Sequence, residues 1–156
     1  MKSLSAGLLM FRMIDGQPEF YLVHPGGPFW SKKDEGIWSI PKGLAEEGEL
    51  MLDAAKREFE EETGFTALGP FLELGEAKLK SGKRILAWGF ERDVGDAELR
   101  SNAFSIEWPP KSGKTTEFPE VDRGGYFPEE TARSKVHPAQ AVFLDRLIER
   151  LDSATN

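Results

Sequence analysis

Apolar residues alternate or cluster in short runs along most of the chain, which predicts several strands and two helices. Residues 8–12 and 20–24 form two such runs on either side of Asp15 and Gly16, as in a β-hairpin. Further strands are expected at residues 38–40, 68–74, 84–92 and 103–108. The run at 84–92 is nearly all apolar, as a central strand would be.

The clearest predicted helix covers residues 49–63. Ala55 and Phe59 lie four positions apart on one side of it, and Gly64 stands where a helix ends. A second helix is expected over residues 138–151, with an apolar stripe made of Val142, Leu144, Leu147, Ile148 and Leu151. Residues 24–36, 93–102 and 109–125 are expected as loops. This order predicts an α/β fold, an α/β/α sandwich with a mixed β-sheet.

Composition narrows the class of protein. The 156 residues suit a single domain, residues 1–156. There are 20 basic and 27 acidic side chains and a net charge of −7, which disfavours a nucleic acid polymer as partner. The chain has no Cys, which excludes thiolate metal sites and fits the cytoplasm. No run is long enough for a transmembrane helix, so no membrane partner is expected. The apolar start superficially imitates a secretion signal, but Arg12 and Asp15 close it, and a strand is expected there.

A cluster of carboxylates stands at the end of the first predicted helix. Glu58, Glu61 and Glu62 share one helix face at spacings of three and four, where like charges repel. They also lie at the helix C-terminus, where the macrodipole disfavours anions. The alternative is a solvated acidic face, with Arg57 paired to Glu61 in the i, i+4 geometry.

A hard divalent cation would relieve this repulsion. Oxygen ligands suit Mg²⁺, Mn²⁺ or Ca²⁺ and not zinc or copper, and the chain lacks the alternating Asp/Asn loop of an EF-hand. Just before the helix, Pro41, Lys42 and Gly43 form a turn that could aim a backbone carbonyl at a metal and bring Lys42 to a phosphate. A plain turn is the alternative.

Residues 43–65 match the Nudix signature G-x5-E-x7-R-E-U-x-E-E-x-G-U, where U is a bulky apolar residue, without a departure. The chain therefore resembles the Nudix hydrolases, and the predicted order of elements is similar to that fold. The resemblance implies hydrolysis of a nucleoside diphosphate linked to another group, with Mg²⁺ or Mn²⁺ as cofactor. A small-molecule nucleotide would be the binding partner, and the protein would be a monomer or homodimer.

The resemblance also implies roles for the residues of the signature. The metal ligands would be Glu58, Glu61, Glu62 and the carbonyl of Gly43. Arg57 would orient the glutamates, Glu49 would support the loop, and either Glu58 or Glu61 would be the general base. Some family members add a glutamate from a late loop, for which Glu120 is the first candidate and Glu117 the second.

Signals for the substrate lie outside the signature. Residues 38–43 are similar to the segment entering the signature in diadenosine polyphosphate hydrolases and nucleoside triphosphate pyrophosphohydrolases, although Ile40 replaces their usual second proline. Lys78, Lys80, Lys83 and Arg84 form a basic patch suited to polyphosphate, unless they only surround a solvated turn. Aromatic residues that could stack a base, or simply pack, are Phe29, Trp30, Tyr126 and Phe127.

Three functional hypotheses follow. The first is a Mg²⁺-dependent hydrolase that cleaves a phosphoanhydride bond in a dinucleoside polyphosphate or nucleoside triphosphate. The second is a catalytically silent nucleotide-binding module on the same fold, and the third a structural domain with an acidic helix. Residues 112–115 resemble the end of a P-loop, but Trp108 occupies the required glycine position. His24 and His137 each precede a proline and are expected in turns.

Overall fold

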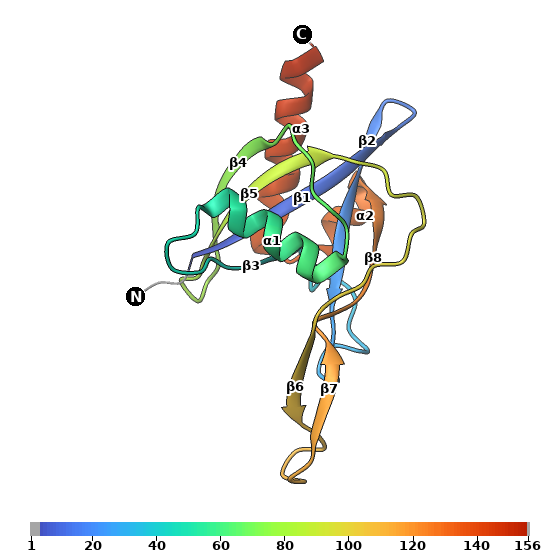
Figure 1. Ribbon diagram of the computed structural model, residues 1–156. Helices are drawn as coiled ribbons and strands as arrows, with labels where there is room; N and C mark the ends of the chain where they lie inside the picture. The colour runs from blue at the N-terminus through green and yellow to red at the C-terminus, as the bar shows by residue number, and fades with distance from the viewer. Residues whose placement is uncertain (1–3, 156) are drawn as a thin grey trace.

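The computed structural model describes residues 4–155, and within them six strands form one mixed sheet in the order β4-β5-β1-β2-β8, with β3 also paired to β1 (Figure 1). The strands are β1 Leu4–Ile14, β2 Gln17–Pro25, β3 Lys42–Leu44, β4 Leu72–Lys78, β5 Arg84–Glu91 and β8 Val121–Pro128. β1 and β5 run parallel, whereas the other neighbours run antiparallel. This arrangement confirms the predicted mixed sheet.

The first two strands form the predicted hairpin. Asp15 and Gly16 both have positive φ, 51° and 78°, as a tight turn of this kind requires. β1 pairs with β2 from Phe11↔Phe20 to Ile14↔Gln17. The apolar run near the N-terminus is therefore a strand from Leu4 onward; residues 1–3 lie outside the described part of the chain.

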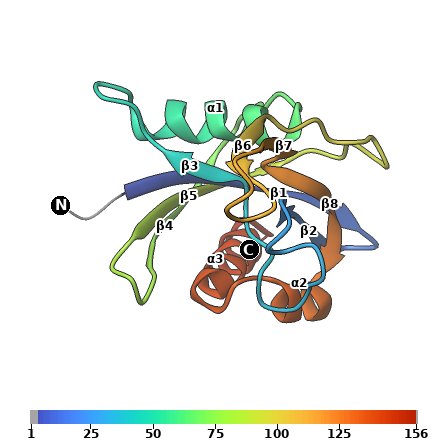
Figure 2. The same cartoon turned by 90° about the horizontal axis from the view of Figure 1, so that it is seen from below.

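Helices cover both faces of the sheet. α1 (Met51–Thr63) lies on one face, and α2 (Glu129–Lys135) and α3 (Ala141–Thr155) lie on the other (Figure 2). The core under α1 includes Ala6, Leu8, Met10, Ala54, Ala55, Phe59 and Phe90. The core under α3 includes Leu9, Phe11, Phe20, Leu22, Phe143, Leu144 and Leu147. Successive residues of β1 thus enter opposite cores, and the predicted α/β/α sandwich is confirmed.

α1 begins two residues later than predicted and ends where expected. Gly64 adopts a left-handed conformation (φ 79°), and its N–H donates to the carbonyl of Glu60 at 2.8 Å, which closes the helix. Glu49 lies in the turn before the helix, where its N–H donates to the Glu46 carbonyl at 3.0 Å.

Several boundaries differ from the prediction. The strand expected at 68–74 is β4, shifted toward the C-terminus, and residues 38–40 form only isolated bridges. The predicted loop 109–125 is wrong, because it contains β7 (Thr115–Pro119) and the start of β8. β7 pairs with β6 (Ala103–Glu107) in a separate hairpin that projects from the body (Figure 1). The second predicted helix is α3, preceded by the 3₁₀ turn η1 (Pro138–Gln140), while α2 was not predicted.

No helix within residues 4–155 has the length and apolar character needed to cross a membrane.

Replacing Phe59 by Ala should lower the free energy of unfolding by about 3–5 kcal/mol, because a cavity would remain between α1 and β5. Phe59 is fully buried, and its ring meets Phe90 edge-on at 5.2 Å. Urea titration measures the change, with Glu60→Ala on the exposed side of α1 as the matched control, expected within about 0.5 kcal/mol of wild type. A loss below about 1 kcal/mol for Phe59→Ala would contradict the described packing.

Candidate active site

The carboxyl group of Glu58 rests directly against the backbone of Gly43. A Cβ atom built on Gly43 would lie 2.1 Å from the carboxyl carbon of Glu58, which is far inside van der Waals contact. Gly43 is held in β3, paired with Ala6 of β1, so it cannot move aside without breaking the sheet. Any other residue at position 43 would displace Glu58, and the structure therefore explains the glycine of the signature.

Arg57 joins the loop before α1 to the glutamates on it. Its Nε and Nη2 donate to Glu49 at 2.9 and 3.0 Å, and Nη1 donates to Glu58 at 2.9 Å and to Glu61 at 3.1 Å. Nη2 also donates to the carbonyl of Leu44 at 3.0 Å. All five N–H donors of a guanidinium are therefore used. Hydrogen bonding to Glu49 raises the pKa of Arg57, which keeps this centre cationic.

Glu62 follows Glu61 near the C-terminal end of α1. Burial raises the pKa of Glu62 to about 8; Lys42 opposes that shift by its charge and by a backbone hydrogen bond, while the charges of Glu58 and Glu120 add to it. Burial likewise raises the pKa of Glu58, against the hydrogen bond from Arg57. The site thus holds carboxyl groups whose charged forms are poorly compensated by protein groups alone.

Glu120 joins the cluster from a distant part of the sequence. It stands between β7 and β8, where its N–H donates to the Asn102 carbonyl at 2.8 Å; Asn102 in turn donates its N–H to the Glu61 carbonyl at 2.8 Å. Burial and the charge of Glu61 raise the pKa of Glu120. Glu117, the second candidate, lies on β7 opposite Ser105 in the projecting hairpin. The role of Asn102 was not predicted, because it acts through its backbone.

The donor set fits a hard divalent cation, since it consists of carboxylate oxygens and the backbone carbonyl of Gly43. Within residues 4–155, no three His, Asp or Glu side chains are arranged closely enough to hold an ion in their present rotamers. Arg57 holds Glu58 and Glu61 by hydrogen bonds, so a bound cation would share these two carboxylates with Arg57.

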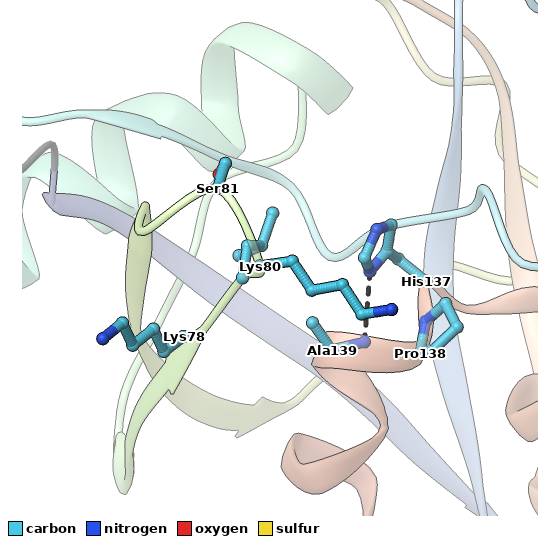
Figure 3. A pocket seen from close by; sticks show the side chains of 7 residues that line it. Lys78, Lys80, Ser81, His137, Pro138 and Ala139 are labelled. Carbon is cyan, nitrogen blue, oxygen red and sulfur yellow. Dashed lines mark hydrogen bonds between the residues drawn. The ribbon is translucent and has the colours of Figure 1, made fainter.

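The predicted basic residues line two neighbouring cavities. Lys42, Lys83 and Arg84 line a cavity of about 320 Å³ that includes Gly43. Lys78 and Lys80 line a larger cavity of about 620 Å³ together with residues at the start of η1 (Figure 3). Leu79 contributes to both cavities, and neither is lined by a carboxylate. The predicted pair Lys80 and Lys83 is therefore divided between the two.

The aromatic candidates do not converge on the glutamates. The hydroxyl of Tyr126 donates to the Arg92 carbonyl at 2.6 Å and accepts from the Val94 N–H at 3.0 Å, and Arg12 lies over its ring. These contacts favour a structural role for Tyr126. Phe127 packs edge-on against Trp38 and Phe29 against Trp108, and Lys33 lies over Trp30.

The two histidines differ from each other. The prediction that His24 is a turn residue is wrong, because it is fully buried near the end of β2 and both ring nitrogens have partners. The prediction for His137 is confirmed: its Nδ1 accepts the N–H of Ala139 at 3.1 Å and caps η1 (Figure 3).

An α/β/α sandwich with this glutamate signature between β3 and the end of α1 defines a protein of the Nudix class. The family model described as NUDIX domain matches residues 2–147, so the chain belongs to the Nudix family. The expected enzyme class, a Nudix nucleotide pyrophosphohydrolase, is thereby confirmed.

The individual relatives share between 20% and 37% sequence identity with this chain over the regions that align. An uncharacterized 17.7 kDa protein of Enterobacteria phage T4, from the e-segB intergenic region, is 32% identical over 131 residues, 82% of this chain and 83% of that protein. An 8-oxo-(d)GTP phosphatase of Mycolicibacterium smegmatis is 37% identical over 75 residues, 47% of this chain but 23% of that protein. The fold resembles a C. elegans Ap4A hydrolase, with a TM-score of 0.66, 20% identity and coverage of 97% and 98% of the two chains.

Metal-free protein should lose stability as the pH rises from about 5 to 8. The pKa of Glu62 is raised to about 8, so folded protein retains a proton that unfolded protein releases, and the slope is negative. Urea titrations in EDTA measure this slope, which Glu62→Gln should reduce. Glu60→Gln, at an exposed position, is the control. An equal slope in wild type and Glu62→Gln would show that Glu62 is not the group whose raised pKa causes the loss of stability.

Proposed function

We propose that the protein is a Mg²⁺- or Mn²⁺-dependent hydrolase that cleaves a phosphoanhydride bond in a dinucleoside polyphosphate or a nucleoside triphosphate. The observation that carries this proposal is the cluster of Glu58, Glu62 and Glu120, whose pKa values are all raised, beside the tight contact with Gly43. A protein gains nothing in stability from such a cluster, whereas a divalent cation would compensate it.

The cation would be held by Glu58, Glu61, Glu62 and the carbonyl of Gly43, with Glu120 as a further ligand. When bound, it would neutralise charge on the phosphates and support the charge that develops as the bond breaks. The raised pKa values mean that protons compete with the cation for these carboxyl groups.

The protein's own groups supply orientation and a base. Arg57 fixes the rotamers of Glu58 and Glu61 by charge-assisted hydrogen bonds, and Glu49 holds Arg57 in turn. Either Glu58 or Glu61 would accept the proton of the attacking water. Water would attack phosphorus in line with the leaving oxygen, so placement of the base matters as much as its basicity.

The two basic cavities support a substrate with an extended phosphate chain. Lys42, Lys80 and Lys83 would bind it, since none of them has an ion pair within residues 4–155. The cavity around Lys42 borders Gly43, and the cavity around Lys80 adjoins it across Leu79. The activities named for the C. elegans and mycobacterial proteins belong to the same substrate classes. We further propose that residues 1–156 form a single domain that works as a monomer or homodimer without a nucleic acid polymer.

A panel of diadenosine tetraphosphate, dGTP, 8-oxo-dGTP and ADP-ribose, incubated with the protein and Mg²⁺, should yield product from at least one member. Glu61→Gln should lower kcat by at least about 100-fold, because it removes a candidate base and a ligand. Glu60→Gln, at the variable position of the signature, is the matched control and should retain full activity. Chromatography of the products measures turnover, and reaction in ¹⁸O-labelled water locates the attacked phosphorus.

Full turnover by Glu61→Gln would contradict the proposed role of Glu61 as a candidate base and metal ligand. Saturable binding of a nucleotide without product from any member of the panel would favour the silent binding module instead.

The variant Lys80→Ala/Lys83→Ala should raise KM by about tenfold, a loss of about 1.4 kcal/mol of binding, with kcat nearly unchanged. Both side chains are exposed and lie in the β4–β5 turn, so their removal should leave the fold intact. Lys111→Ala/Lys114→Ala, which removes the same charge from the tip of the β6–β7 hairpin, is the control for net charge. Equal kinetics for the two double variants would remove the lysines from the binding site.

A further inference from the structure

His24 makes a hydrogen bond through each of its ring nitrogens. Its Nε2 lies 2.7 Å from the carbonyl of Lys33, and its Nδ1 lies 2.8 Å from Oδ1 of Asp122. The His24 side chain is completely buried, whereas Asp122 is 31% exposed. The ring therefore joins two segments of the chain from inside the protein.

The partner Asp122 occupies an irregular point of the sheet. The register of β2 against β8 passes from His24↔Arg123 to Pro25↔Val121, so Asp122 is the extra residue of a β-bulge. Bulges bend a strand and change the direction of its neighbouring side chains. Glu120 stands just before this bulge, and the hydrogen bond between His24 and Asp122 fixes the bulged residue.

The segment after His24 contacts the same region a second time. The N–H of Gly26 donates to the carbonyl of Glu120 at 2.8 Å. A Cβ atom on Gly26 would lie 1.9 Å from the carbonyl oxygen of Pro119, so the two backbones are in direct contact. The other ring nitrogen of His24 contacts the Lys33 carbonyl, so His24 also holds the far part of this loop.

We propose that His24 is a positioning residue: its ring ties the 26–36 loop to the β8 bulge and thereby fixes the position of Glu120. This inference rests on the proposed function, because it gives Glu120 a part in the reaction. His24 itself contacts neither the glutamates of α1 nor a substrate cavity.

The other groups around the ring are accounted for. Trp38 meets it edge-on at 5.2 Å and donates its Nε1–H to Asp34 at 2.8 Å. Lys135 of α2 pairs with Asp34 at 2.8 Å, and Arg123 lies over the Trp38 ring. Asp122 is therefore the charged side chain that contacts the ring directly.

Urea titration first establishes which of the variants His24→Asn and Asp122→Asn fold, because His24 is fully buried.

Kinetics then test positioning. His24→Asn should lower kcat about tenfold with KM changed less than about twofold, and Asp122→Asn should behave alike if the first variant fails to fold. Asp34→Asn, which keeps an acceptor for Trp38, is the matched control and should retain wild-type kcat. Placed in a Glu120→Gln background, His24→Asn or Asp122→Asn should cause no further loss.

The outcomes separate the two claims. If Glu120→Gln keeps full activity, the role of Glu120 in the proposed function fails. If Glu120→Gln is impaired but the losses multiply in the double variant, His24 does not act through Glu120 and this inference fails.

Discussion

The hydrogen bonds of Arg57 are the constraint on which the site depends. They connect the loop before α1, through Glu49 and the Leu44 carbonyl, to Glu58 and Glu61 on the helix. Without this cation, several half-buried carboxylates would face each other at a helix C-terminus, where the macrodipole already disfavours them. The acidic cluster is therefore stable only around a positive charge. Arg57 supplies part of this positive charge, and we propose that a divalent cation supplies the rest.

Strand β3 contributes to both the acidic and the basic part of the site. Gly43 of β3 contacts Glu58 on the α1 side, and its neighbour Lys42 lines a basic cavity with Lys83. The charge of Lys42 also opposes the rise in the pKa of Glu62, so this lysine interacts with the acidic cluster and lines the basic cavity as well. The long-range contacts of Glu120 complete the site from the far edge of the sheet, through backbone hydrogen bonds alone.

The signature and the strong periodicity made the hairpin, α1 and β5 predictable from sequence. The sequence predicts a loop at the start of β8 because Gly124 and Gly125 have no side chains and Asp122 and Arg123 break the alternation at the bulge. α2 is short and buries only Ala132 completely, so it leaves no periodic pattern. The contact of His24 with Asp122 joins residues 98 positions apart, which no local pattern can reveal. The acidic cluster and its contacts with Arg57 and Glu49 were thus predictable from sequence, whereas the backbone contacts of Glu120 and the contact of His24 with Asp122 were not.

The most direct measurement is a crystal structure of the protein with Mg²⁺ and a non-hydrolysable dinucleoside polyphosphate. The account predicts an ion bound by carboxylate oxygens of α1 and by the Gly43 carbonyl, in contact with the phosphate chain. Glutamates with no ion between them, and the nucleotide held elsewhere, would contradict it.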